Sequence, residues 1–84
     1  MESYMRITLH PGEMLSNIKS TSEDSDITIL FLSEWDYGDV IVVNDEEFVT
    51  GYKRGDTRIY PGDSEINIAN GSTSIMQLEI ITMK

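Results

Sequence analysis

The stretch richest in groups that could do chemistry runs from Glu34 to Asp39 and reads EWDYGD, with acids around two aromatic rings. Trp and Tyr are frequent anchors at protein interfaces. Carboxylates around such anchors steer a basic partner during encounter and fix its register. The stretch therefore predicts a contact surface built on Trp35 and Tyr37. In the alternative interpretation Trp35 closes the core and Tyr37 is a turn residue.

A second acidic group follows one short apolar segment later. Both groups belong to an interval between Ser20 and Tyr52 that contains nine acids and neither Lys nor Arg. Spaced carboxylates on a rigid sheet can imitate the phosphates of nucleic acid, and small viral proteins that block DNA-binding enzymes are similar in size and acidity. The predicted partner-binding residues are Glu34, Trp35, Asp36, Tyr37, Asp39, Asp45, Glu46 and Glu47.

The sequence offers few residues that could bind a metal ion. It contains no cysteine and one histidine, His10, so it has neither a Cys–His cluster nor a His pair for a transition ion. Calcium takes several oxygen ligands, and the two loops that flank residues 40–43 offer carboxylates. The predicted strand between those loops holds them about 13 Å apart. We therefore expect no metal site and no cofactor.

Catalytic residues are equally scarce. His10 has no Ser or Cys partner at a spacing that identifies a nucleophilic pair, and a solvated turn histidine is the simpler interpretation. Among fifteen acids some carboxylate pair always lies close, so such a pair does not identify a glycosidase. We expect no catalytic residue and a protein that is not an enzyme.

Two short motifs have simple structural interpretations. Arg54-Gly55-Asp56 spells an adhesion tripeptide, but Gly-Asp is a common turn pair. Asn70-Gly71-Ser72 matches a glycosylation sequon, which matters only in a secreted eukaryotic protein. Asn-Gly is also the preferred pair of two-residue hairpin loops. We predict a turn at the first motif and a hairpin at Asn70-Gly71.

The charge narrows the class of partner. Fifteen acids face six Lys or Arg, for a formal net charge of -9. This charge opposes direct binding to nucleic acid and to anionic membranes. It favours a basic protein, such as a nucleic-acid-binding enzyme, through long-range steering. Because the sequence shows neither a signal-peptide pattern nor a membrane-length apolar run, we expect a cytoplasmic protein without membrane contact.

Regular turn signals divide the chain into short segments rich in Ile, Val, Thr, Phe and Tyr. Turns about every 8 to 12 residues between such segments are typical of a sandwich or small barrel. The fold class is therefore all-β, a small antiparallel sandwich or jelly-roll barrel of about seven to eight short strands in one domain, residues 1–84. We predict strands near 4–9, 14–20, 27–32, 40–43, 47–52, 57–60, 65–69 and 74–82.

Two segments of the sequence each fit two alternative structures. The runs ITILFL and VIVV are apolar on both faces, which predicts central strands or a surface that a second subunit covers. The segment PGEMLSNIK begins like a helix, so at most one short helix near residues 11–19 is the alternative to a strand there. HPGEML is also similar to the opening of some helix-turn-helix antitoxins, but no second helix follows it.

The second half of the chain resembles the closing strands of a cupin-like jelly roll. That pattern runs Gly-Asp, a strand, Pro-Gly, a strand, then Asn and a final apolar strand. It is matched by Gly55-Asp56, Ile59, Pro61-Gly62, Ile66, Ile68, Asn70 and Leu78, and ITLHPGE suits a first cupin strand and its turn. Metal-dependent cupins bind their ion with a cluster of His and a carboxylate, whereas His10 is the only histidine here. The resemblance therefore implies the fold and not metal-dependent chemistry.

Three functional hypotheses follow from these observations. The leading one is a non-enzymatic interaction protein that presents the acidic surface of residues 23–47 to a basic protein, as an inhibitor or nucleic-acid mimic. The second is a structural module that forms a homo-oligomer, with faces such as VIVV packed against copies of themselves. The third is a metal-free cupin-like domain that binds a small ligand or sugar.

Overall fold

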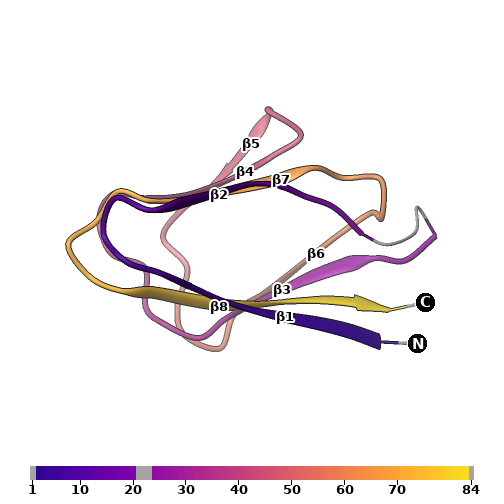
Figure 1. The fold of residues 1–84 in the computed structure, drawn as a ribbon, viewed down its shortest axis with the longest axis horizontal. Helices are drawn as coiled ribbons and strands as arrows, with labels where there is room; N and C mark the ends of the chain where they lie inside the picture. The colour runs from indigo at the N-terminus through magenta and orange to yellow at the C-terminus, as the bar shows by residue number, and fades with distance from the viewer. Residues whose placement is uncertain (1, 21–23, 84) are drawn as a thin grey trace.

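Eight strands form two antiparallel sheets in the computed structural model, which describes the backbone of residues 2–20 and 24–83 (Figure 1). The first sheet, sheet A, has the order β1-β8-β3-β6, with bounds Glu2–Leu9, Met76–Met83, Ile27–Phe31 and Thr57–Tyr60. The second, sheet B, has the order β2-β7-β4-β5, with bounds Met14–Ile18, Ile66–Asn70, Asp39–Val43 and Glu47–Val49. The predicted all-β sandwich is therefore confirmed.

The core lies between the two sheets and follows the period of two that strands impose. Ile27, Ile29 and Phe31 of β3 point inward and are buried, as are Ile41 and Val43 of β4. Fully burying one such side chain stabilises a fold by about 1.5–3 kcal/mol. Both strands are central, because β3 lies between β8 and β6 while β4 lies between β7 and β5. The prediction of central positions for ITILFL and VIVV is thus confirmed.

The segment with the helical alternative is strand β2. It pairs with β7, and its register shifts between Leu15 and Ile18. Asn17 sits at this irregularity with a φ of 61°, and its backbone N–H donates to Asn67 Oδ1 at 2.9 Å. The bulge turns both Leu15 and Ile18 toward the core, which imitates the spacing of a helix face. The described residues contain no helix, so none of them provides a helix long and apolar enough to span a membrane.

The predicted hairpin at Asn70-Gly71 is wrong. Strands β7 and β8, which this turn joins, belong to different sheets, so the connection crosses the sandwich. Gly71 is not among the glycines with positive φ, whereas the favoured two-residue hairpin turns need left-handed residues. The Asn70 side chain instead hydrogen-bonds to the loops around it, so Asn70 is not a residue of a hairpin turn.

The loops gather at two ends of the sandwich. Residues 10–13, 32–38, 50–56 and 71–75 lie at one end, which we call the anchored end (left in Figure 1). Residues 24–26, 44–46 and 61–65 lie at the other, the acidic end. The antiparallel register sets this division, because Asp39 pairs with Asn70 at one end of sheet B and Val43 pairs with Ile66 at the other.

Candidate functional site

The loop between β3 and β4 brings two aromatic side chains together at the anchored end. The ring centroids of Trp35 and Tyr37 lie 5.8 Å apart, with their planes tilted by 60°. Tyr37 is 85% exposed, whereas Trp35 is half-buried and packs against the core. The structure thus combines the two interpretations of this stretch, with one ring supported by the core and one presented to solvent.

Three hydrogen bonds fix the loop between β3 and β4. The indole Nε1 of Trp35 donates to the carbonyl oxygen of Asp39 at 2.8 Å, and its backbone N–H donates to the carbonyl of Tyr52 at 3.3 Å. The backbone N–H of Asp39 donates to the carbonyl of Asp36 at 3.0 Å and closes the turn. These bonds fix the Trp35 ring and the turn that carries Tyr37.

Asp39 is an internal support of the loop. Its side chain is 2% exposed, and Oδ2 accepts hydrogen bonds from the hydroxyl of Tyr52 at 3.3 Å and from the backbone N–H of Asp36 at 3.4 Å. The other oxygen, Oδ1, finds no partner among the described residues. The prediction that Asp39 contributes to an exposed contact surface is wrong, because β4 begins at Asp39 and turns this side chain inward.

Tyr52 completes the support beneath the loop. Its ring stacks on Phe31 with centroids 3.9 Å apart and planes inclined by 13°. Burial of the phenol, followed by the nearby Asp39 carboxylate, raises the pKa of Tyr52 far above its ordinary value. The hydroxyl therefore keeps its proton over the physiological range and donates to Asp39 throughout it.

Two glycines join this loop to its neighbour. Gly38 has a φ of 109°, and a Cβ built on it would lie 2.4 Å from the carbonyl oxygen of Gly71. The backbone N–H of Gly71 donates to the carbonyl of Gly38 at 3.2 Å. Side chains would hold the two backbones apart, so glycine permits this close approach.

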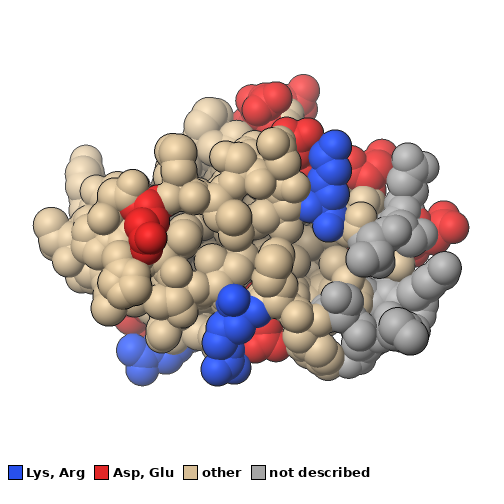
Figure 2. All heavy atoms as spheres, viewed as in Figure 1, with Lys and Arg blue, Asp and Glu red and all other residues tan. Residues whose placement is uncertain are grey.

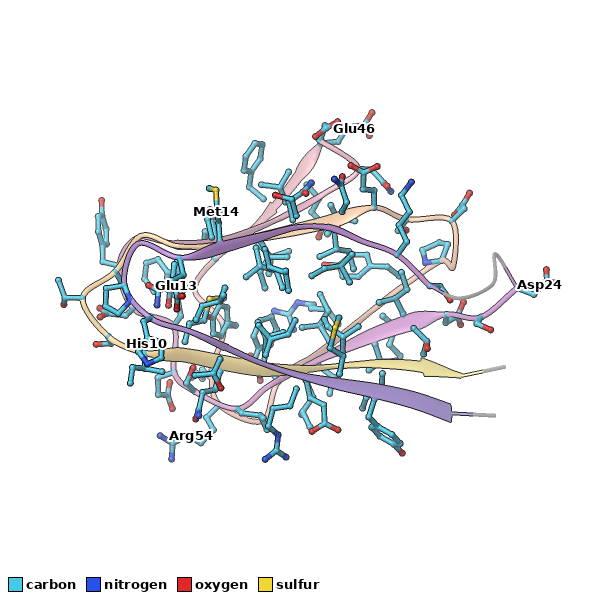
Figure 3. The ribbon with its side chains drawn as sticks, in the orientation of Figure 1. His10, Glu13, Met14, Asp24, Glu46 and Arg54 are labelled. Atoms are coloured by element: carbon cyan, nitrogen blue, oxygen red, sulfur yellow. The ribbon has the colours of Figure 1, made fainter. Side chains whose placement is uncertain are left out.

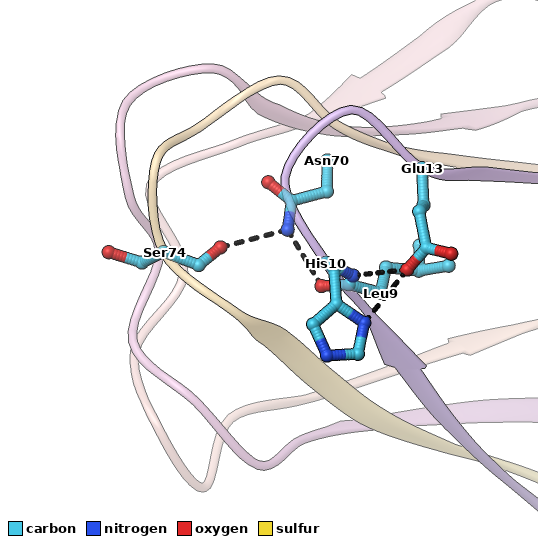
Figure 4. Close-up of polar contacts among 5 residues, drawn as sticks. All are labelled: Leu9, His10, Glu13, Asn70 and Ser74. Atoms are coloured by element: carbon cyan, nitrogen blue, oxygen red, sulfur yellow. Dashed lines mark hydrogen bonds and ion pairs between the residues drawn. The ribbon is translucent and has the colours of Figure 1, made fainter.

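Asn70 links the remaining loops of the anchored end (Figure 4). It is buried, and its Nδ2 donates to the carbonyls of Leu9 and Ser74, both at 2.8 Å. Its Oδ1 accepts from the backbone N–H of Ser72 at 3.0 Å and from the Ser72 hydroxyl at 2.8 Å. The Asn70 amide thus hydrogen-bonds to backbone groups of two connections. These bonds offset the large cost of burying polar groups without partners.

His10 and Glu13 form a local cap in the turn between β1 and β2 (Figure 4). Glu13 Oε1 accepts from the backbone N–H of His10 at 2.6 Å and lies 3.0 Å from the ring Nδ1. The hydrogen bond from the His10 backbone, then that from its ring, lower the pKa of Glu13. Both side chains are exposed, so His10 is the solvated turn histidine that its position predicts.

The second acidic group lies at the opposite end of β4. Asn44 and Asp45 have φ values of 54° and 57°, and they turn the chain between β4 and β5. Asp45, Glu46 and Glu47 are all exposed, and Figure 3 shows Glu46 at the tip of this hairpin, away from His10 and Glu13. The eight predicted partner-binding residues therefore do not form one surface.

The β4–β5 turn instead lies beside acids from another part of the chain. Asn44 and Glu65 exchange two hydrogen bonds, since each backbone N–H donates to an oxygen of the other residue at 2.8–2.9 Å. Lys19 Nζ approaches Glu65 Oε2 at 3.8 Å. Most of the acidic atoms in view in Figure 2 gather at the upper right, where these turns lie. Sequence analysis missed this grouping because only the β4–β7 register creates it.

The space between the sheets does not fit the His-and-carboxylate cluster of a metal-dependent cupin. Its lining is apolar, with Ile66 and Ile68 of β7 facing Leu78 and Ile80 of β8 among the buried side chains. Within residues 4–20 and 24–82, no three or more His, Cys, Asp or Glu side chains gather as metal ligands would. The one histidine of the chain, His10, lies outside this space in an exposed turn.

No protein-family model matches the chain, and no curated protein matches it either. Solved structures do match. A protein from Photorhabdus luminescens has a TM-score of 0.77 at 17% identity, over 99% of this chain and 62% of that one. An RmlC-like cupin with a double-stranded β-helix fold, from Methanocaldococcus jannaschii, has a TM-score of 0.73 at 19% identity, over 95% of this chain and 67% of that one. The chain has a cupin-like fold.

This result confirms the cupin-like resemblance of the second half and extends it to the whole chain. A protein from Thermotoga maritima described as a predicted oxalate decarboxylase has a TM-score of 0.74 at 19% identity, over 95% of this chain and 64% of that one. This cupin-like chain thus spans less than two thirds of the Thermotoga and Photorhabdus proteins. At such identities the likeness establishes the fold alone.

Proposed function

We propose that this cupin-like chain is a metal-independent, non-enzymatic binding domain that holds a small cationic ligand against Trp35 and Tyr37. The observation that carries the proposal is the aromatic pair itself, on a loop that hydrogen bonds fix and that also carries the exposed Glu34 and the partly exposed Asp36. A rigid loop loses little conformational freedom when a ligand binds, which favours binding.

The chemistry of these side chains suits a quaternary or primary ammonium group. Trp and Tyr faces attract such cations, with about 0.5–1 kcal/mol per contact at exposed sites. Carboxylates beside the rings add direct attraction, and a net charge of -9 raises the local concentration of cations. The same charge favours a cation over a neutral sugar, which would gain nothing from it.

The rest of the interior supports binding rather than catalysis. Among the described residues, the buried side chains are mostly aliphatic or aromatic, and the buried polar ones, such as Asp39 and Ser25, belong to no group of three or more acids and histidines. The Asp39–Tyr52 pair is committed to the loop through its own hydrogen bond. The leading hypothesis from the sequence, a broad acidic face for a basic protein, loses support because its residues divide between two ends of β4.

Fluorescence can test this proposal directly, because Trp35 is the only tryptophan. We expect choline to change the Trp35 emission in a saturable way at millimolar concentration, whereas its uncharged isostere 3,3-dimethyl-1-butanol does not. Higher salt should weaken the choline response, because the attraction is partly between exposed charges. A saturable response to glucose, with none to choline, would replace the cationic ligand with a sugar.

Matched variants locate the site. Tyr37→Ala should weaken choline binding about two- to fivefold, the loss of one exposed cation–π contact. Phe48→Ala removes an exposed ring from the outer face of sheet B and should leave binding unchanged. Equal affinity in the Tyr37→Ala variant and the unaltered chain would refute the aromatic site.

A further inference from the structure

Asn70-Gly71 is the only Asn-Gly pair in the sequence. In such a pair the backbone nitrogen of glycine can attack the carboxamide carbon of asparagine, because glycine has no side chain to hinder the approach. A new C–N bond closes a succinimide ring, the bond from the carboxamide carbon to its –NH₂ group breaks, and ammonia leaves with the proton of the glycine N–H. Water then opens the ring to aspartate or isoaspartate.

The fold occupies both reacting groups with hydrogen bonds. Figure 4 shows the Asn70 Nδ2 between the carbonyls of Leu9 and Ser74, to which it donates at 2.8 Å. Its Oδ1 accepts from the backbone N–H and the hydroxyl of Ser72. The attacking nitrogen belongs to Gly71, and its N–H donates to the carbonyl of Gly38 at 3.2 Å. The reaction therefore requires that these contacts break first.

The backbone of Asn70 is held as firmly as its side chain. Asn70 ends β7 and pairs with Asp39 of β4. Its N–H donates to the carbonyl of Glu13 at 2.9 Å, and its carbonyl accepts from the N–H of Gly12 at 2.8 Å. Closing the five-membered ring requires rotation about the Cα–C bond of Asn70, away from the extended strand conformation. That rotation removes the Asn70 carbonyl from the Gly12 N–H, so the folded anchored end opposes ring closure.

We propose that Asn70-Gly71 is a deamidation site that the folded anchored end protects and that opening of this end exposes. Aspartate has no amide donor, so the carbonyls of Leu9 and Ser74 would face a buried carboxylate in place of their partner. Isoaspartate also adds a carbon atom to the main chain at the end of β7. A chain that has reacted while open cannot rebuild the anchored end, which makes the opening irreversible. The proposal is independent of the cationic ligand.

The other asparagines provide internal controls. Asn17 and Asn67 precede isoleucine and Asn44 precedes aspartate, so a side chain hinders attack by the next backbone nitrogen at each of them. Asn17 and Asn44 are exposed in the folded chain, unlike Asn70. Folding should therefore slow the reaction most at the one asparagine where it is intrinsically fastest.

Peptide mapping by mass spectrometry tests the protection during incubation at mildly alkaline pH. In urea we expect Asn70 to react faster than Asn44, Asn17 and Asn67. In the folded chain the rate at Asn70 should fall at least about tenfold, because only opened molecules react. A peptide of residues 66–75, incubated with and without urea, measures the direct effect of urea. Equal corrected rates at Asn70 in the folded and unfolded chains would overturn the proposal, as would an unfolded chain in which Asn44 reacts as fast as Asn70.

A pair of glycine variants tests whether the anchored end controls the reaction. Gly38→Ala places a Cβ 2.4 Å from the Gly71 carbonyl oxygen, whereas Gly55→Ala places one with nothing within 4 Å. The two variants are compared at urea concentrations that give them equal free energies of unfolding, so that global unfolding contributes equally. Gly38→Ala should then react at Asn70 at least about threefold faster, because its opening is local. Equal rates would overturn control by the anchored end.

The variant Asn70→Asp tests the irreversibility, because it has the composition of the aspartate product. We expect its ratio of folded to unfolded chain to be at least about tenfold lower than that of Asn44→Asp, which keeps a side-chain acceptor for the Glu65 N–H. Circular dichroism during urea denaturation measures both. An Asn70→Asp chain that does not fold at all supports the proposal, whereas one with the urea midpoint of the unaltered chain would overturn it.

Discussion

The two ends of the sandwich use the same polar residue types in opposite ways. At the anchored end Asp39, Asn70 and Ser72 are buried, and each one bonds to neighbouring backbone or side chains. At the acidic end Asp45 and Glu46 are exposed on a tight turn and carry charge into solvent. Buried polar groups stabilise a fold only when they are paired, whereas exposed acids mainly set solubility and repulsion.

This difference shows which parts of the molecule can hold a binding site. A loop that buried hydrogen bonds fix from below presents its exposed rings in one geometry, as with Trp35 and Tyr37. The turn at the acidic end has carboxylates and one hydrogen bond from a core ring, since the Tyr60 hydroxyl donates to Glu47 Oε1 at 3.5 Å, but the aromatic pair that could face a cation lies at the anchored end. For this reason the ligand proposal belongs to the anchored end, although the acids are denser at the other.

Replacing the buried Asn70 should produce the largest difference between the two ends. Asn70→Ala leaves the carbonyls of Leu9 and Ser74 and the amide of Ser72 without their partner. We expect a loss of about 3–4 kcal/mol in the free energy of unfolding, since each buried unpaired group costs about 1–3 kcal/mol. Urea denaturation measures this loss.

The matched variant is Asn44→Gly at the acidic end, because glycine tolerates the φ of 54° there. Asn44 is exposed and its side chain accepts from the backbone of Glu65 at 2.8 Å. We expect a loss of about 1 kcal/mol or less for such an exposed bond. Similar losses at Asn70 and Asn44 would show that burial does not separate the two ends.

The strands of this fold were predictable because their signals are local. Alternation placed Ile27, Ile29 and Phe31 on one face, and apolar residues on both faces marked β3 and β4 as central. The spacing of Gly-Asp, Pro-Gly and Asn70 in the sequence indicates a cupin-like jelly roll. Each signal depends on residues near one another in the chain, where backbone geometry alone fixes the outcome.

Gly38 tests the close approach between loops at the anchored end. Gly38→Ala places a Cβ 2.4 Å from the Gly71 carbonyl oxygen in a backbone conformation with φ of 109°. We expect a loss of about 2–3 kcal/mol from strain and displacement of the loop. Gly55→Ala has a φ of 90° with nothing within 4 Å of the new Cβ, so it measures the strain alone, at about 1 kcal/mol.

The same pair of variants has a second readout. Gly38→Ala should also weaken the choline response, because it shifts the loop that carries Trp35. Gly55→Ala should not. If thermal unfolding gives equal melting temperatures for the two variants, the contact between Gly38 and Gly71 does not support the loop.

The arrangement of the site was not predictable because it depends on contacts between distant segments. Nothing near Asp39 in the sequence indicates that Tyr52 lies beneath it, or that Gly71 meets Gly38. Strand β4 separates Asp36 from Asp45 and Glu46, and its pairing with β7 places Asn44 beside Glu65; Glu23 lies outside the described residues. The bulge at Asn17 likewise gives β2 the residue spacing of a helix face. The segment is a strand because it pairs with β7, which is distant in the sequence.

Acid titration should reveal the cap at the anchored end. The hydrogen bonds from His10 lower the pKa of Glu13 below its ordinary value of 4.5 in the folded state. A lowered folded pKa means that the unfolded state binds the proton more readily. The stabilisation is therefore present above pH 4.5 and is lost as the pH falls below it through the lowered pKa.

The measurement is the urea midpoint as a function of pH between 7 and 3. Glu13→Gln should remove part of the fall in stability on the acidic side, because Gln cannot titrate yet still accepts a hydrogen bond. Glu46→Gln at the acidic end makes no comparable bond and should leave that part of the profile in place. A Glu13→Gln profile that coincides with the original would place the titration elsewhere.

Charge reversal should give the smallest effect, with opposite sign to the others. Glu46 is exposed among Asp45, Glu47 and the nearby Glu65, with Lys19 as the cation that approaches this group. Glu46→Lys should therefore stabilise the fold by about 0.5 kcal/mol or less, the scale of exposed charge interactions. Glu34→Lys makes the same charge change at the anchored end, where Lys53 and Arg54 lie in the neighbouring loop, and should gain less. Both gains should vanish near 0.5 M salt, where screening acts within a few ångströms. A gain at Glu46 that persists in high salt would come from a new contact, and the acidic end would then be a packed structure like its counterpart.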